Sequence, residues 1–351
     1  MTSLLFSQSP IARFAAEVIT ENDCSYFYLY QLEPQEEKLV TMVACWMKNH
    51  CVVGDDYSPK QDMIENGIQP KMQTKLCRFP EDTAPFAGED LEIVWGKEGC
   101  LAGLLHKGEL ICVIPYWSDA NFPGYSKFSS MEEPGLYPLC LQEGNDMFRR
   151  VEEAKQFWAR DFGEVWGEYQ ESVLQDLEAQ YGEAVKYYAI DGGNFPPKGL
   201  AVFEKDGYGY AITVGVGMFP QPGAELYHKD SENHERMELG FAWNAALDFD
   251  VMPVLSQLSA IAGIPWIHKT FFDHCHTIDL QASPSYQHAA FLRDDQVGKR
   301  VNSPFLQKNK IGVLWLMPIT DACYEQLTAE ESNLEAVTEQ LQKQGIALEN
   351  L

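Results

Sequence analysis

The chain has 351 residues, of which 45% are hydrophobic and 22% are charged, a balance typical of globular proteins. Asp and Glu number 52 against 26 Lys and Arg, which gives a formal net charge of −26. Such a chain repels the phosphates of nucleic acids, so direct nucleic-acid binding is not expected, and basic proteins are the favoured long-range partners. No apolar run is long enough to cross a bilayer, so no membrane association is expected either.

The length favours two domains, because single hydrophobic cores stop growing at roughly 250–300 residues. Nine cysteines, an odd number, are spread along the chain, which argues against a small disulfide scaffold. Cys45 and Cys112 lie in apolar runs and are expected to be buried hydrophobes. The N-terminal stretch has neither a basic region nor a cleavage site of small residues, so we expect no signal peptide and a reducing, cytoplasmic location.

The first part of the chain carries short runs of aromatic, β-branched and other apolar residues that predict strands. These expected strands cover 24–32, 39–47, 91–95, 100–105 and 109–116. His106, Lys107 and Gly108 predict a hairpin turn between the last two. Polar sequence with scattered Pro and Gly predicts loops and short helices over 48–90, and a loop rich in Pro, Gly and Ser follows over 117–138.

The pattern changes near residue 143. Apolar residues recur at steps of three and four from Val151 to Leu177, which predicts helical structure. Gly163 and Gly167 each cost roughly 1 kcal/mol in a helix interior, so we expect two helices, or one with a bend near Gly163. We place the domain boundary here, with an N-terminal α+β domain of unknown role over 1–142 and a second domain over 143–351.

The second half alternates between strand and helix patterns. Its expected strands cover 184–190, 199–204, 208–216, 235–243, 276–280, 288–293 and 311–319. A helix is expected over 251–262, capped by Asp250 and ended at Gly263, and a capping box at Thr328 predicts a final helix that stops at Gly345. The order predicts an α+β fold, in which helices pack on a mainly antiparallel or mixed sheet.

One short stretch, 271–280, concentrates residue types that bind metals. It contains Asp273, His274, Cys275 and His276, with His268 just upstream. If the stretch is extended, His274 and His276 point to the same face and supply half of a zinc site, which Asp273 or His268 could complete. No CxxC and no second HxH accompany them, and a packed, hydrogen-bonded histidine at the start of a strand accounts for the pattern without a metal. We favour the interpretation without a metal.

Motifs of the common enzyme classes are missing from the sequence. It has no GxxxxGK[ST], no GxSxG and no HExxH, so no cofactor and no catalytic residue are expected. Glu235, Arg236 and Glu238 predict either an ion-pair network that fixes a sheet or the lining of a polar binding groove. Trp117 and Tyr125, in the loop that contains Phe-Pro-Gly-Tyr, are candidates for ligand contacts, although a packed loop explains them too.

Four groups of residues in the second half follow one another in a familiar order. They are the paired strands at 199–203 and 210–218, Glu-Arg-Met-Glu-Leu at 235–239, Cys-His-Thr-Ile at 275–278, and Leu-Met-Pro-Ile-Thr at 316–320 with Glu325 after it. In this order and spacing, about 165–345 resembles the suppressor-of-fused family. Cys275 stands where the family has Gly, and the segment before Met218 has one extra residue. Residues 1–140 show no such resemblance.

The resemblance implies a binding protein. Animal members of the family grip an extended segment of a transcription factor, a form of strand addition. Bacterial members often resemble immunity proteins of toxin systems, and an acidic immunity protein suits a basic toxin domain because opposite potentials speed association. We therefore expect a non-enzymatic protein-binding module, in one form an immunity protein that neutralises a toxin.

The residues expected at the binding surface come from both halves of the chain. They are Glu235, Arg236, Glu238, His276, Trp117 and Tyr125. Two alternatives stay open: a metal-dependent hydrolase that uses His274, His276 and Asp273, and an interaction protein in signalling that has no toxin as partner. The resemblance implies no metal-binding or catalytic role for His276.

Overall fold

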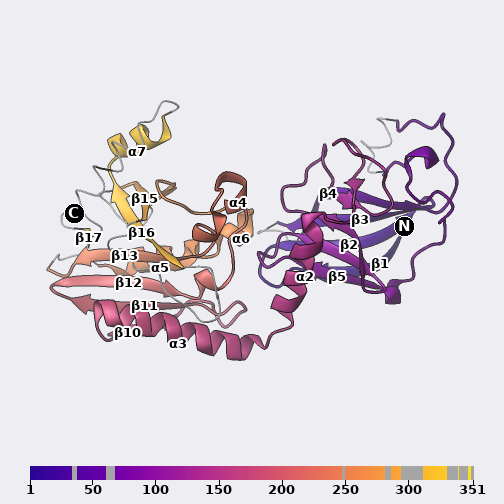
Figure 1. Cartoon of the computed structure of the whole chain (residues 1–351). Helices are drawn as coiled ribbons and strands as arrows, with labels where there is room; N and C mark the ends of the chain where they lie inside the picture. Colours follow the sequence, from indigo (N-terminus) through magenta and orange to yellow (C-terminus); the bar gives the residue numbers. More distant parts are fainter. Residues whose placement is uncertain are drawn as a thin grey trace. The chain divides into compact units, whose positions relative to one another are not determined.

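The computed structural model describes residues 1–33, 38–60, 68–246, 250–280, 286–293, 311–329, 339 and 347–348. The chain forms two compact units, Met1–Arg160 and Asp161–Leu351 (Figure 1). Both combine helices with mainly antiparallel sheets, which confirms the α+β class. Among the described helices, none has the length and apolar character that a membrane span requires.

The units divide after the helix α2 (Asp146–Trp158), whereas the boundary expected after residue 142 precedes it. The reason is that α2 packs on the sheet of the first unit, against β5 (Leu91–Trp95). The helical pattern that began near residue 151 therefore serves two different cores, one in each unit.

The first unit begins with a four-stranded antiparallel meander. Its strands, in spatial order, are β1 (Thr2–Gln8), β2 (Phe14–Glu21), β3 (Cys24–Leu32) and β4 (Leu39–Asn49). The expected strands 24–32 and 39–47 are confirmed by β3 and β4. β1 and β2 were not expected; β2 is largely buried on both faces, so its sequence lacks the alternation that marks a half-buried strand.

A second sheet completes the first unit. It contains β5, β6 (Ala102–His106), β7 (Glu109–Ile114), β8 (Tyr125–Ser126) and β9 (Leu139–Cys140). The expected strands over 91–95, 100–105 and 109–116 are confirmed, and so is the turn between the last two, where Lys107 and Gly108 adopt φ of 52° and 81°. The described part of 48–90 contains two 3-10 turns, η1 (Thr74–Leu76) and η2 (Gly88–Asp90).

The core of the first unit lies in two layers. The helix α2 buries Met147, Val151 and Ala154 against apolar residues of the second sheet. A Cβ at Gly103 would lie 2.8 Å from Val151 Cγ2, so the glycine permits this close approach of helix and strand. The other layer joins the two sheets, where the buried thiols of Cys45 and Cys112 lie 3.4 Å apart. Both cysteines are fully buried, as expected of small hydrophobes, and burial raises the pKa of Cys45.

The second unit begins with the helix α3 (Phe162–Tyr181), which packs on β11 (Gly199–Lys205) and β12 (Tyr208–Val214) (Figure 1). The side chain of Asp161 caps α3 by accepting a hydrogen bond of 2.9 Å from the Gly163 N–H. Two helices are therefore present, as expected, and Gly163 lies in the first turn of α3. The buried face of α3 is formed by Val165, Tyr169, Val173, Leu177 and Tyr181.

An eight-stranded mixed sheet forms the body of the second unit. Its strands are β10 (Lys186–Ala189), β11 (Gly199–Lys205), β12 (Tyr208–Val214), β13 (Met237–Asn244), β14 (Thr277–Asp279), β15 (His288–Arg293), β16 (Gly312–Ile319) and β17 (Ala347–Leu348). The spatial order is β10-β11-β12-β13-β16-β15-β14, and β17 also pairs with β13. β13 pairs antiparallel with β12 and parallel with β16 and β17. All seven strands expected in this half are confirmed.

Short helices connect these strands. They are η3 (Val216–Met218), α4 (Ala224–Tyr227), η4 (Ser231–Asn233), α5 (Met252–Ile261), α6 (Ile264–His268) and α7 (Asp321–Thr328). The helix expected over 251–262 is confirmed by α5, and Asp250 Oδ1 accepts a hydrogen bond of 3.0 Å from the Met252 N–H. The chain does not leave helical structure after Gly263 as expected, because Pro265 fits the first turn of α6. The final helix expected from Thr328 to Gly345 lies almost wholly outside the described residues.

Candidate functional site

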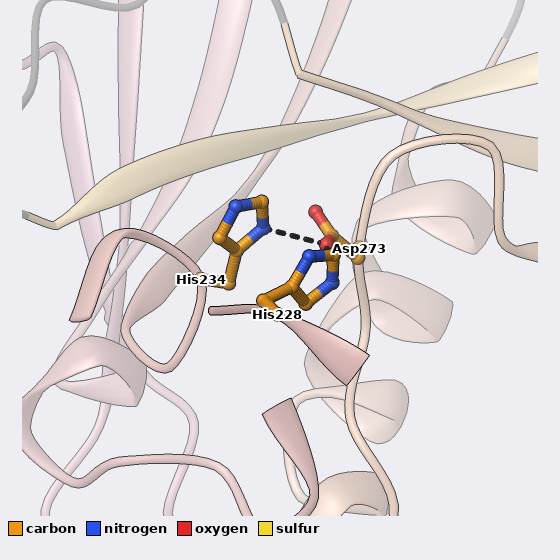
Figure 2. Close-up of side chains that lie close together, drawn as sticks. All are labelled: His228, His234 and Asp273. Atoms are coloured by element: carbon orange, nitrogen blue, oxygen red, sulfur yellow. Dashed lines mark hydrogen bonds and ion pairs between the residues drawn. The ribbon is translucent and has the colours of Figure 1, made fainter. Parts of the chain in front are cut away.

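Three polar side chains of the second unit converge from separate connections (Figure 2). His228 follows α4, His234 follows η4, and Asp273 lies in the segment between α6 and β14. His228 Nε2 lies 2.8 Å from Asp273 Oδ2, and His234 Nδ1 lies 2.7 Å from the same oxygen. One carboxylate oxygen thus faces a nitrogen from each of two imidazoles.

The two imidazoles are stacked on each other. Their ring centroids are 3.7 Å apart and their planes differ by 3°. Phe271 meets the His228 ring edge-on, with centroids 5.9 Å apart and an interplanar angle of 89°. The apolar ring restricts the rotation of His228, so the two histidines present their nitrogens to Asp273 side by side.

The carboxylate of Asp273 is buried and is held from its other side as well. Its Oδ1 accepts a hydrogen bond of 2.8 Å from the His274 N–H and lies 3.7 Å from Arg293 Nη2. Burial alone would raise the pKa of Asp273, but the His274 N–H, the Arg293 charge and His234 together outweigh it and lower the pKa. Asp273 is therefore a carboxylate anion at neutral pH.

A buried amide fixes the distance between the segments that carry the site. Gln221 Nε2 donates to the His234 carbonyl at 2.8 Å and to the Phe272 carbonyl at 2.7 Å. Gln221 Oε1 accepts from the Phe272 N–H at 2.8 Å. One side chain thus hydrogen-bonds to the backbone at His234 and at the residue before Asp273. The fold therefore holds these two residues close together, in addition to the attraction between their own side chains.

Within the described part of the chain, His228, His234 and Asp273 form the group of possible metal ligands whose donor atoms all lie within 4.8 Å of one another. Two imidazoles and a carboxylate are a donor set that suits zinc. The same groups could exchange protons, since a carboxylate commonly orients a histidine that acts as acid or base. The side chains of His228 and His234 are 28% and 20% exposed, so a small solute can reach both.

The structure brings Asp273 into this group but leaves out the histidines expected beside it. Cys275 adopts a left-handed φ of 65°, and the strand β14 begins only at Thr277, so the alternation expected from 273 onward does not occur. His274 Nδ1 instead accepts a hydrogen bond of 3.0 Å from the Arg293 N–H. The hydrolase alternative that relied on His274, His276 and Asp273 therefore loses its ligand set.

The remaining histidines of that stretch lie apart from the group. His276 is exposed and packs on Phe271, with ring centroids 5.1 Å apart. His268 is the last residue of α6. The signal that could have indicated the true partners was weak: His228 and His234 lie in one polar loop, but His234 and Asp273 are 39 positions apart.

Two residues expected at a binding groove are buried inside the second unit. Arg236 is 4% exposed and donates from Nη1 to the carbonyls of Gly217 at 3.1 Å and Met218 at 2.5 Å. Glu238 is fully buried in β13. Because neither side chain can reach a partner, the expected binding role of Arg236 and Glu238 is wrong, and both stabilise the sheet. Glu235 keeps 24% of its side chain exposed.

Glu238 lies in a nest of donors. Tyr169 and Thr213 each donate a hydroxyl to it at 2.6 Å. Three consecutive backbone N–H groups complete the shell, from Gly215 at 2.9 Å, Val216 at 3.2 Å and Gly217 at 3.1 Å. Burial raises the pKa of Glu238, and the hydrogen bonds that it accepts offset part of this effect.

Trp117 and Tyr125, the other expected contact residues, belong to the first unit. Both are partly buried and pack against the core beneath α2. Trp117 meets Tyr116 edge-on with centroids 4.8 Å apart, and the Arg150 guanidinium lies 5.4 Å from its ring.

No model of a known protein family matches the chain, and no curated protein matches it.

Asp273→Asn is expected to lower the free energy of unfolding by about 1.5–3 kcal/mol at neutral pH, as is typical of hydrogen bonds to charged groups. The pKa of Asp273 is lowered from its ordinary value of 3.8. The stability that the ionised carboxylate adds to the folded state is therefore fully present above that value, and it is lost as the pH falls through the lowered pKa. Urea unfolding of both proteins between neutral and acidic pH would show their difference shrinking on acidification. Asp206→Asn, in the exposed turn between β11 and β12, is the control; a difference that grows in acid would contradict the assignment.

Proposed function

We propose that the chain is a non-enzymatic protein-binding module that adds an extended segment of its partner to the β10 edge of the second unit. β10 is the terminal strand of the described sheet and pairs with β11 on its inner side. An added strand would bind through backbone hydrogen bonds, and pockets for its side chains would give specificity.

Apolar exposure along this edge is the observation that carries the proposal. Val185, just before β10, is 50% exposed, and Tyr187 within it is 39% exposed. Proteins usually protect an open edge with charges or proline, whereas β10 has the sequence Lys-Tyr-Tyr-Ala, with a single charge. Exposed apolar groups beside unpaired backbone favour a surface that is covered by a partner.

The register shows which backbone groups are available. The Ile190 N–H donates to the Lys198 carbonyl at 2.9 Å, and Tyr188 pairs with Leu200. In an antiparallel ladder, alternate residues bond to the same neighbour. Tyr188 therefore bonds towards β11, while Tyr187 and Ala189 direct their N–H and carbonyl groups towards the open side.

The charge and the sequence resemblance support the same proposal. With a net charge of −26, the chain attracts basic proteins over long range. A suppressor-of-fused-like second unit would grip an extended segment, and an immunity protein that neutralises a basic toxin domain is the form that best suits the charge. The nine cysteines are free thiols, which suits the reducing cytoplasm that we propose as its location.

Ala189→Pro tests the edge directly. Proline removes the N–H of Ala189 that would bond an added strand, yet it is tolerated on edge strands where that N–H faces solvent. Loss of one or two backbone hydrogen bonds should weaken partner binding about tenfold or more. The measurement is capture of basic proteins by the immobilised chain at low and high salt, followed by binding titration of the captured protein against each variant.

Ala189→Val is the matched control, because it keeps the N–H and favours the strand. We expect the Val variant to retain the partner and the Pro variant to lose it, with equal thermal unfolding of both. Equal binding by the Pro variant would place the contact elsewhere on the chain. Failure of the unmodified chain to retain any protein would contradict the protein-binding proposal itself.

A further inference from the structure

We infer that His228, His234 and Asp273 form a transition-metal site, with Zn²⁺ as the best-fitting ion and one coordination position left to solvent. This inference stands on the second unit alone and does not depend on the β10 edge. Imidazole nitrogens select zinc and its neighbours over magnesium and calcium, which prefer a full set of oxygens. A single carboxylate beside two imidazoles matches the zinc preference.

The donor atoms are already gathered around one point. Zinc bonds of about 2.0–2.1 Å in a tetrahedral arrangement separate neighbouring donors by about 3.3 Å. Asp273 Oδ2 lies 2.8 Å from His228 Nε2 and 2.7 Å from His234 Nδ1. Because the two rings are stacked with nearly parallel planes, the ion enters only when His234 turns out of the stack, so that both ring lone pairs point at one position while Phe271 holds His228 in place.

The neighbours of these ligands have the arrangement that metal sites commonly use. Asp273 Oδ1 is held by the His274 N–H at 2.8 Å, which leaves Oδ2 for the ion. On the far side of His234, Nε2 lies 3.7 Å from the exposed Asp230 Oδ1, so a small movement of Asp230 would bring its carboxylate within hydrogen-bond distance of the ring. A carboxylate behind a ligating histidine orients the ring and makes its other nitrogen a stronger donor.

Arg293 sets the selectivity of the site. Its Nη1 lies 3.5 Å from His234 Nδ1 and is anchored by the Asn233 carbonyl at 2.7 Å. This fixed cation opposes any ion that is bound by charge alone, as magnesium and calcium largely are. Zinc gains enough from imidazole coordination to overcome that repulsion, so the site should discriminate strongly against the hard cations.

The experiment uses the full chain, stripped of metal by a chelator and titrated with zinc in competition with a chromophoric indicator. One equivalent per chain should bind, and a large excess of magnesium or calcium should not displace it. His228→Ala and His234→Ala should each weaken zinc binding by about 100-fold or more. Removal of a residue that only supports a ligand already costs up to about 100-fold, and these variants remove a ligand itself. His268→Ala, which removes an exposed histidine at the end of α6 and outside the group, is the matched control and should keep the full affinity.

Cobalt gives a second readout that separates coordination from folding. Bound in place of zinc, it should show the intense visible bands of a four-coordinate nitrogen and oxygen site, and His234→Ala should lose them while its circular dichroism stays unchanged. Three results would overturn the proposal: no stoichiometric zinc, equal loss in the His268→Ala control, or a thiolate-to-cobalt absorption that assigns the ion to one of the cysteines.

Discussion

Glu238→Ala is expected to destabilise the second unit by about 3–5 kcal/mol, the range seen when one partner of a buried charged network is removed. Five donors converge on this carboxylate, two from the hydroxyls of Tyr169 and Thr213 and three from the backbone at 215–217. Truncation leaves all five without an acceptor in a dry core, and each unpaired group costs about 1–3 kcal/mol unless the chain relaxes.

Hydrogen exchange followed by mass spectrometry, together with urea unfolding, would localise this loss to β12 and β13. The control is Glu204→Ala, which removes the same side chain from an exposed position of β11 and should change stability by no more than about 0.5 kcal/mol. Glu238→Gln should fall between the two, because its amide keeps one acceptor but turns an N–H towards other donors. Equal stability of Glu238→Ala and Glu204→Ala would refute the role of the nest.

Gly124→Ala should be comparably severe in the first unit, at about 3–5 kcal/mol from backbone strain and overpacking combined. Gly124 precedes β8 with φ of 116°, a conformation that residues with a Cβ avoid. A Cβ there would lie 2.3 Å from the Val113 carbonyl oxygen and 3.2 Å from Ile114 Cα. These contacts are with backbone, so no side chain can rotate away to relieve them.

Gly108→Ala separates the two contributions to that loss. Gly108 also has a left-handed φ, 81°, but a Cβ at this position meets nothing within 4 Å. Its substitution should cost only the conformational part, about 1–2 kcal/mol. Thermal or urea unfolding of both variants measures the difference, and equal losses would show that strain, not the clash with β7, dominates at Gly124.

Most strands were predictable because their patterns are local. The aromatic, β-branched and apolar runs of β3 and β4 and the turn residues Lys107 and Gly108 each determine structure within a few positions. β2 was missed because Ala15, Ala16 and Glu17 interrupt its larger apolar residues, so it has no such run. The break between α2 and α3 was predictable from Gly163, but which core each helix joins depends on packing that no periodicity shows.

The candidate site was only partly predictable, for a different physical reason. Asp273 was singled out by its neighbours in sequence, yet its true partners approach from a loop 39 positions away. The left-handed turn at Cys275 rotates His274 and His276 out of the expected common face. The binding role expected of Glu238 was wrong because a charged residue in a strand usually faces solvent. Three of its five donors are backbone N–H groups after β12, which a sequence pattern does not reveal.

The parallel pairing at the centre of the second sheet has a consequence for how the chain is made. Met237 of β13 pairs with Gly312 of β16, far along the sequence, whereas β11 and β12 are joined by a tight turn. The ribosome therefore releases β10–β13 well before the strand that completes them. During that interval the edge of β13 that later pairs with β16 exposes unpaired backbone N–H and C=O groups, which are prone to pair with other chains until β16 arrives.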